Sequence, residues 1–194
     1  GRMGKDHPPR HINDTRGHPW SAIGRLNITT GGFCTATVID DYRILTAAHC
    51  LWNRRTARWY PPCALHFLAG YQRGEYAVHA MAARLDIAPG YRPGKRLSAR
   101  DWAVVTLDRP VTALTGRIEL ASAAPQRGEP LLQAGYSRDR AHVLTVDRSC
   151  RRQSANAGPG LLAHDCDATF GDSGSPLLLP ADSGWQVAGI HVAV

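Results

Sequence analysis

Three short motifs in this chain contain side chains that together can activate a serine for attack on a carbonyl group. His49 lies in the motif TAAHC, Asp101 begins the motif DWAVV, and Ser173 lies in the motif GDSGSP. A serine hydroxyl is a poor nucleophile at neutral pH, so an imidazole must remove its proton and later protonate the leaving group. A buried carboxylate must hold that imidazole in one tautomer and stabilise its charged form. These residue types therefore predict nucleophilic acyl transfer, with His49, Asp101 and Ser173 as the catalytic residues.

The serine motif also contains the groups that a negatively charged reaction intermediate needs. Gly171 and Ser173 flank Asp172, and a tight turn there would direct the N–H groups of Gly171 and Ser173 at the oxygen of the tetrahedral intermediate. One such donor typically contributes about 3–4 kcal/mol to the transition state. Gly171 and Gly174 suit a turn whose backbone must approach the substrate closely. We therefore expect the oxyanion hole at Gly171 and Ser173.

The three motifs and their order resemble those of the chymotrypsin-fold (trypsin-like) serine proteases, and the similarity extends over nearly the whole chain. The segment 31–39 (GGFCTATVI) resembles the strand that precedes the His motif in that family. The chain is most similar to the bacterial glutamyl-endopeptidase-like branch. This similarity rests on Gly4-Lys5-Asp6 with Arg10, the segment 19–26 (PWSAIGRL), Ser175 where animal trypsins usually carry glycine, and Gly189-Ile190-His191. The resemblance implies peptide substrates, whereas the triad alone fits peptides or esters.

Apolar and β-branched segments separated by turn residues predict an all-β chain, with one short helix near residues 47–52. The resemblance implies two packed six-stranded antiparallel β-barrels with the active site in the cleft between them. Residues 1–113 would carry His49 and Asp101, and residues 114–194 would carry Ser173. We expect an incomplete second barrel, because the chain stops at Val194 inside an expected strand. The expected strands are 22–27, 33–39, 44–46, 65–69, 76–85, 103–107, 131–137, 143–150, 160–165, 176–179 and 186–194.

The chain has five cysteines, and four of them form two pairs with equal spacing. Cys34 and Cys50 bracket a hairpin in the first half, where the resembling family has a disulfide. Cys150 and Cys166 precede the serine motif. We expect the disulfides Cys34–Cys50 and Cys150–Cys166, with Cys63 left as a buried free thiol or paired outside this chain. Two disulfides indicate an oxidising compartment, so the protein is expected to be secreted or periplasmic.

Composition limits the possible partners. The formal charge is +7, and 21 of the 23 basic residues are arginine. The arginines at 54–58 and 148–152 fit a solvated surface or attraction of acidic partners, and no nucleic-acid motif accompanies them. The sequence contains no run of 18 apolar residues, which is the length that a membrane-spanning helix needs. We expect a peptide or protein substrate, without nucleic-acid or membrane partners, and the sequence does not indicate the oligomeric state.

The sequence contains no motif that is typical of a metal or cofactor site. Neither C-x-x-C nor H-E-x-x-H spacing occurs. Calcium sites need loops rich in Asp and Glu, and the sequence has no such loop. We interpret the adjacent pair Asp40-Asp41 as part of a hairpin turn. We therefore expect no cofactor and no metal.

The specificity of the enzyme is open at this stage, because two residues point to opposite substrates. Asp167 lies six residues before Ser173, where trypsin-like relatives have the floor of the pocket for P1, the residue before the scissile bond, and an Asp there selects Arg or Lys. His191 corresponds to the histidine that helps the glutamyl branch bind an acidic P1 side chain. Asp167 could instead be a structural loop residue or pair with His191 or an arginine. His191 could equally be a strand-packing residue.

Two other aspartates carry alternatives. Asp86 competes with Asp101 as the orienting carboxylate, although Pro89-Gly90 after it suggests a loop. Asp172 occupies the position that, in trypsin-like enzymes, pairs with a new amino terminus made by zymogen cleavage; the glutamyl branch often has a neutral residue there. Since Arg2-Met3-Gly4 lies where an activated amino terminus would be, we hypothesise that the α-amine or a nearby arginine pairs with Asp172.

The function expected from these motifs is a serine endopeptidase acting through an acyl-enzyme. One alternative is a catalytically silent binding protein on the same fold, although such proteins usually lose a triad residue and this chain keeps all three. Another is a quality-control protease of the Htr type, which seldom relies on disulfides and carries an appended peptide-binding domain that is not visible here.

Overall fold

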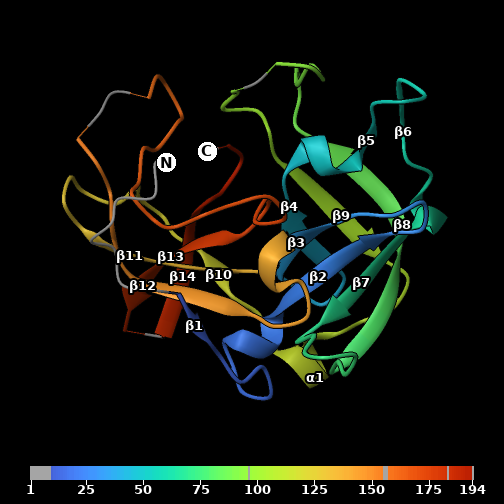
Figure 1. Ribbon diagram of the computed structural model, residues 1–194, viewed down its shortest axis with the longest axis horizontal. Coiled ribbons are helices and arrows are strands. Elements are labelled where there is room, and N and C mark those ends of the chain that lie inside the picture. Colours follow the sequence, from blue (N-terminus) through green and yellow to red (C-terminus); the bar gives the residue numbers. More distant parts are fainter. Residues whose placement is uncertain (1–9, 96, 155–156, 183, 194) are drawn as a thin grey trace.

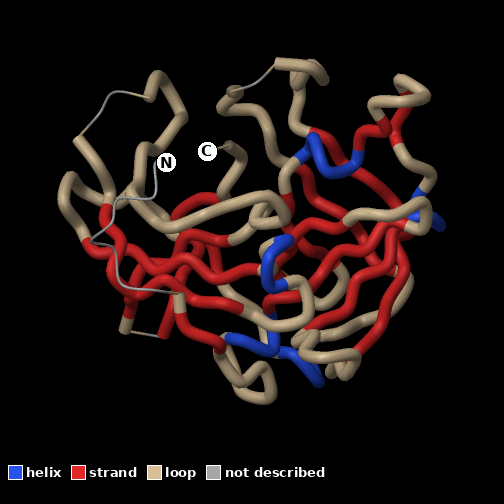
Figure 2. Tube along the Cα trace, viewed as in Figure 1, coloured by secondary structure: helices blue, strands red, loops and turns tan. Residues whose placement is uncertain are grey.

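The computed structural model describes residues 10–95, 97–154, 157–182 and 184–193. Figure 1 shows two regions of β-structure, with the first half of the chain in blue and green beside the second half in orange and red. Strands fill both regions, and the helices are short pieces at their margins (Figure 2). Within the described residues the one α-helix is α1 (Thr112–Thr115). The predicted all-β class is confirmed.

The first region is a closed barrel with the strand order β2-β3-β4-β9-β8-β7. Strands β7 and β9 alternate between buried and partly exposed residues; in β7, Leu65, Phe67 and Ala69 are buried in the barrel. This alternation is the two-residue period of a half-buried strand. All six strands expected here are present, with ends displaced by at most two residues. They are β2 (Ile23–Ile28), β3 (Phe33–Val38), β4 (Arg43–Thr46), β7 (Leu65–Ala69), β8 (Val78–Ile87) and β9 (Ala103–Leu107).

The second region is a six-stranded sheet in the order β1-β12-β11-β13-β14-β10. Its pairings are antiparallel except that of β10 with β14, which is parallel. The two edge strands are only two residues long, which limits the exposed edge that they present. The strands are β1 (His11–Ile12), β10 (Glu119–Leu120), β11 (Pro130–Gly135), β12 (Thr145–Arg151), β13 (Pro176–Ala181) and β14 (Gly184–Ile190).

Two expected strands of the second half need correction. The strand predicted at 160–165 is wrong, because the described residues there form a loop with one isolated bridge between Arg152 and His164. Gly158, just before this range, and Gly160, its first residue, have left-handed φ values of +102° and +72°, which turn the chain. The last expected strand ends at Ile190, and Val194 lies outside the described residues. The division at residues 113/114 stays a prediction; β1, from the amino-terminal range, pairs with β12.

Short elements connect the strands. The helix expected near 47–52 is the 3₁₀ helix η2 (Ala48–Leu51), and the hairpin that follows pairs β5 with β6. The remaining elements are β5 (Trp52–Asn53), β6 (Arg58–Trp59), η1 (Trp20–Ala22), η3 (Pro62–Ala64) and η4 (Arg138–Arg140).

Buried hydrogen bonds fasten the two regions together. Tyr136, which follows β11 and is fully buried, donates its N–H to Thr35 Oγ1 at 3.0 Å and its hydroxyl to the carbonyl of Tyr71 at 2.6 Å. Thr35 in β3 also donates its N–H to the carbonyl of Ser173 at 2.9 Å. Since buried polar groups are costly to leave unpaired, these contacts fix the turn of Ser173 against the first barrel.

Candidate active site

Strand pairing brings two of the predicted catalytic residues together. His49 lies in η2, three residues after the end of β4, and Asp101 lies two residues before β9. Because β4 pairs with β9 and Thr46 lies opposite Ala103, the ends of these strands place His49 beside Asp101. Ser173 comes from the second region, in the turn before β13.

The three side chains form a continuous hydrogen-bonded chain. His49 Nδ1 lies 2.7 Å from Asp101 Oδ2, and His49 Nε2 lies 2.9 Å from Ser173 Oγ. The backbone N–H of His49 donates to Asp101 Oδ1 at 2.8 Å, and Asp101 is only 5% exposed. With the proton of the neutral ring on Nδ1, facing the carboxylate, Nε2 is free to accept the hydroxyl proton of Ser173. Folding therefore brings residues 49, 101 and 173 into the geometry that proton transfer requires.

The turn around Ser173 has a backbone shape that only glycine adopts readily. Gly171 has a φ of +99°, and a Cβ there would lie 2.9 Å from the carbonyl oxygen of Tyr136. Within the described part of the chain, the N–H groups of Gly171 and Ser173 have no hydrogen-bond partner, whereas the N–H of Asp172 between them donates to the carbonyl of Thr169. The two N–H groups expected to form the oxyanion hole are thus available to a ligand.

Asp172, within the serine turn, is buried, and Arg10 contacts its side chain. Arg10 Nη1 donates to Asp172 Oδ2 at 3.1 Å, and the N–H of Thr169 donates to the same oxygen at 2.8 Å. The same guanidinium places Nε 3.2 Å from Asp167 and Nη2 3.3 Å from Asp139. Burial nevertheless raises the pKa of Asp172 from 3.8 to about 6, while the hydrogen bond from Thr169 and the charge of Arg10 act in the opposite direction.

Of the two partners hypothesised for Asp172, the structure places the arginine there. The side chain of Arg10 is 8% exposed and that of Asp172 is 2% exposed. Sequence reasoning singled out Arg10 only as part of an amino-terminal resemblance. The segments Arg2-Met3-Gly4 and Gly4-Lys5-Asp6 lie outside the described residues.

A cavity of about 600 Å³ lies beside Ser173, and the two specificity candidates relate to it differently. His191 lines this cavity together with His49 and Ser173, whereas Asp167 is not among its lining residues. The carboxylate of Asp167 instead lies beside Arg10, in agreement with the alternative of an arginine partner. His191 follows β14, and its N–H donates to the carbonyl of Ser175 at 2.8 Å.

His191 contacts a second histidine that the sequence did not single out. His191 Nδ1 lies 3.3 Å from His164 Nε2, and His191 is 4% exposed. Burial lowers the pKa of His191 to about 3, with the neighbouring His164 adding to the effect, and burial also lowers the pKa of His164. Both rings are therefore neutral near pH 7. The one sequence signal for His164 is its position two residues before Cys166.

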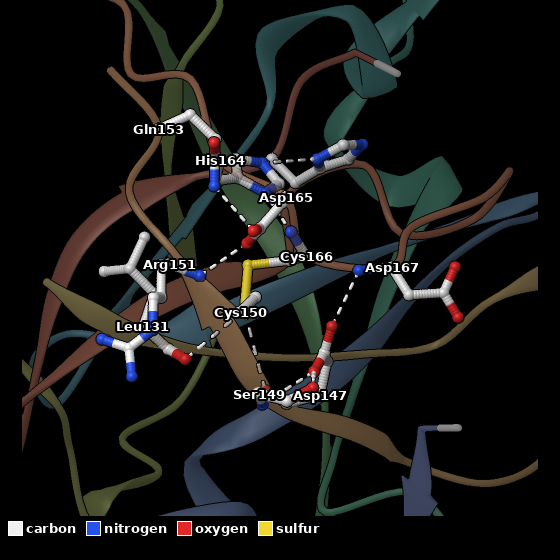
Figure 3. The surroundings of a disulfide bond; sticks show 11 residues. Leu131, Asp147, Ser149, Cys150, Arg151, Gln153, His164, Asp165, Cys166 and Asp167 are labelled. Atoms are coloured by element: carbon white, nitrogen blue, oxygen red, sulfur yellow. Dashed lines mark hydrogen bonds between the residues drawn. A yellow bond between two sulfur atoms is a disulfide. The ribbon is translucent and has the colours of Figure 1, made fainter. Parts of the chain in front are cut away.

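Both expected disulfides are present, Cys34–Cys50 and Cys150–Cys166. Figure 3 shows the second one, with His164 and Asp167 on either side of Cys166 and their side chains pointing in different directions. The N–H of Asp167 donates to Asp147 Oδ2 at 2.8 Å. Cys63 is an exposed free thiol, so the expectation of a buried one is wrong; its place in η3, on the barrel surface, explains the exposure.

The remaining candidates lie elsewhere. Asp86 in β8 accepts a hydrogen bond from Arg84 Nε at 2.9 Å, and Asp101 is the aspartate that contacts His49. Among the described residues, the one group with metal-like proximity is Cys34, His49 and Cys50. Its two sulfur atoms are bonded to each other, so they cannot act as thiolate ligands.

None of the described helices has the length and apolar character that crossing a membrane would require.

Comparison with known proteins agrees with this architecture. A solved structure of a Glu endopeptidase in complex with MPD is similar in fold, with a TM-score of 0.77 and 21% sequence identity, over 94% of this chain and 83% of the other. The sequence model of the trypsin family matches residues 11–194. With a match over nearly its whole length and the fold to accompany it, this chain belongs to the trypsin family.

Proposed function

We propose that the protein is a serine endopeptidase that cleaves peptide bonds through an acyl-enzyme, with His49, Asp101 and Ser173 as its catalytic triad. The observation that carries the proposal is the position of Ser173 Oγ, 2.9 Å from His49 Nε2, with Nδ1 of the same ring 2.7 Å from a buried carboxylate. Trypsin-family membership supports peptides as the substrates.

The proposed reaction uses each group in turn. Ser173 Oγ attacks the scissile carbonyl carbon while its proton passes to His49 Nε2, and Asp101 stabilises the imidazolium. The N–H groups of Gly171 and Ser173 stabilise the negative carbonyl oxygen. His49 then protonates the leaving amine, and the C–N bond breaks to give the acyl-enzyme. Water, deprotonated by His49, hydrolyses the ester and regenerates Ser173.

The decisive variant is Ser173→Ala, which should lower kcat/KM for a cleaved peptide roughly 10⁴- to 10⁶-fold, because triad residues act as a unit. Ser122→Ala, in an exposed loop, is the matched control and should behave as the unchanged protein. A fluorophosphonate should label the unchanged protein and leave Ser173→Ala unlabelled. Near-normal cleavage by Ser173→Ala would refute the assignment of the nucleophile, and failure of the unchanged protein to react would favour a silent binding protein.

For primary specificity, we propose an acidic P1 residue. His191 lines the cavity at Ser173, whereas Asp167 is paired with Arg10 outside it. When His191 Nδ1 accepts a hydrogen bond from His164, the His191 proton is on Nε2 and can be donated to a substrate carboxylate. The similar solved structure is that of a Glu endopeptidase, which agrees with this choice.

A peptide series that varies only P1 tests this proposal. Glu should exceed the isosteric Gln by about ten- to a hundredfold in kcat/KM, the range expected for a hydrogen bond to a charged group. His191→Asn should lose most of this preference. A preference for Arg or Lys would instead assign the pocket to Asp167.

We also propose that the protein functions in an oxidising compartment, secreted or periplasmic, because both disulfides are formed. Fractionation of the native host, followed by thiol labelling of the isolated protein, checks this: labelling of Cys63 alone is expected, and labelling of all five cysteines would contradict it.

A further inference from the structure

Two loops of the first barrel form one wall of the cavity beside Ser173. The first is the β5–β6 hairpin, which contributes Trp52 and Arg54. The second is the loop between β8 and β9, which contributes Tyr91 and Lys95. His191 and Phe170 lie in the other wall, on the second region. The wall from the first barrel therefore faces substrate residues that lie next to P1.

This wall carries two positive charges without partners. Arg54 and Lys95 are exposed, and within the described residues neither forms an ion pair, a hydrogen bond through its side chain, or a contact with an aromatic ring. Many other arginines of the chain, such as Arg16 and Arg84, are paired with a nearby aspartate. The one carboxylate among the described cavity-lining residues is that of Asp101, which is already hydrogen-bonded to His49. A ligand carboxylate in this cavity would find two free cations and no competing free acid.

The aromatic residues beneath these charges give the wall a fixed shape. Trp52 packs edge-to-face on Trp59 with ring centroids 5.0 Å apart, and Trp59 contacts Tyr91 at 6.1 Å. Tyr91 is 9% exposed, so the two loops are packed against each other through these three rings. These contacts hold the backbone of Arg54 beside the cavity, and its side chain is exposed.

The position of this wall relative to the reaction indicates which part of a substrate it meets. The large cavity contains His191, the proposed P1 contact, whereas a second cavity of about 220 Å³ lies on the side of Gly171 and Cys50. Since His191, the proposed P1 contact, and the wall with Arg54 and Lys95 line the same cavity, we assign the substrate residues that precede P1 to the first cavity and the leaving group to the second. Arg54 and Lys95 therefore face the acyl side of the substrate.

We propose that Arg54 and Lys95 form a second acid-binding subsite, which recognises an Asp or Glu side chain two to four residues before the scissile bond, at P2 to P4. The inference rests on the proposed endopeptidase function and extends it from one acidic residue to acidic segments. Exposed ion pairs are weak individually, so the two together should favour an acidic residue about three- to tenfold in kcat/KM.

Matched fluorogenic peptides test this subsite. Each pair has the same P1 residue and differs by Asp or Asn at one position from P4 to P2′, and the Asp/Asn ratio of kcat/KM is measured for each position. The ratio should exceed three at one of P2 to P4 and should fall towards one when NaCl is raised to 0.5 M, because salt screens exposed charges. Arg54→Gln and Lys95→Gln should each lower the ratio. Arg55→Gln, in the same hairpin but outside the cavity lining, should keep it.

The outcomes separate this inference from the proposed function. Cleavage of all peptides with a ratio near one, a preference confined to P1′ and P2′, or a ratio unaffected by Arg54→Gln and Lys95→Gln would overturn the subsite and leave the endopeptidase standing. Absence of cleavage would overturn the endopeptidase. In that case, calorimetric binding of the same peptides to Ser173→Ala still decides the subsite, because the Asp peptide should bind about three- to tenfold more tightly than the Asn peptide.

Discussion

Replacing Arg10 with alanine removes the guanidinium that contacts three carboxylates around the serine turn. Its side chain is 8% exposed, and that of Asp172 is 2% exposed, so the variant leaves a buried carboxylate without its cation. Asp172 lies between the two N–H groups proposed for the oxyanion hole. We therefore expect Arg10→Ala to disorder the turn and to lower the fraction of molecules with a working site.

The size of the effect follows from burial. Removing one partner of a buried ion pair typically costs about 3–5 kcal/mol, because the other charge remains in a poorly solvated position. Since 1.36 kcal/mol corresponds to a factor of ten, kcat/KM should fall roughly 10²- to 10³-fold if most of this cost falls on the active conformation. Arg10→Lys should recover only part of the loss, because one ammonium group cannot span Asp139, Asp167 and Asp172 as the guanidinium does.

Active-site titration and steady-state kinetics measure this effect separately from global unfolding, which a thermal melt monitors. Added guanidinium ion should restore part of the activity of Arg10→Ala, which a merely unfolded variant could not show. Arg16→Ala is the matched control: its side chain is 89% exposed, and its one ion pair among the described residues is with the nearby Asp14. It should change kcat/KM less than twofold.

A value of kcat/KM for Arg10→Ala within threefold of the unchanged protein would refute this reasoning. So would equal losses in Arg10→Ala and Arg16→Ala. Selective acetylation of the α-amine should leave turnover intact, because Arg10 supplies the charge beside Asp172; a large loss would mean that the amine is needed as well.

Gly171→Ala should lower kcat about 10²- to 10³-fold with little change in KM, because a Cβ 2.9 Å from the carbonyl of Tyr136 forces the donor N–H to move; an unchanged kcat would contradict this. Since burial raises the pKa of Asp172 to about 6, its folded form holds a proton more tightly than its unfolded form. The free energy of unfolding, measured relative to Asp172→Asn, should therefore fall by about 2 kcal/mol as pH rises from 4 to 6, and a difference that stays flat or rises would oppose it. Removing the Cys34–Cys50 disulfide by a double Cys→Ala change should lower the free energy of unfolding by about 3 kcal/mol in urea titrations, and an unchanged midpoint would argue against that role.

The local pattern of apolar residues was sufficient to predict the strands of the first barrel, but it did not predict the edge strands of the second sheet. Strands such as β7 and β9 bury alternate residues, and this period of two is visible in the sequence. The edge strands β1 and β10 have two residues each, which is too short for any period to appear. The prediction of a strand at 160–165 is wrong because an apolar segment can also form a loop, and the glycines at 158 and 160 turn the chain.

The sequence by itself predicted the chemistry proposed for this protein, because His49, Asp101 and Ser173 lie in motifs whose residue types allow few other roles. It also predicted the β-class and, with the family resemblance, the two disulfide pairs that the structure confirms. Only the tertiary structure showed that Arg10 forms ion pairs with Asp167 and Asp172, and that His164 contacts the ring of His191. Arg10 and Asp172 are 162 residues apart in the chain, and no local pattern records a contact over that separation. Such contacts exist because folding buries a charge that then needs a partner, and the identity of that partner depends on which segments the packing of the barrel and the second sheet brings together.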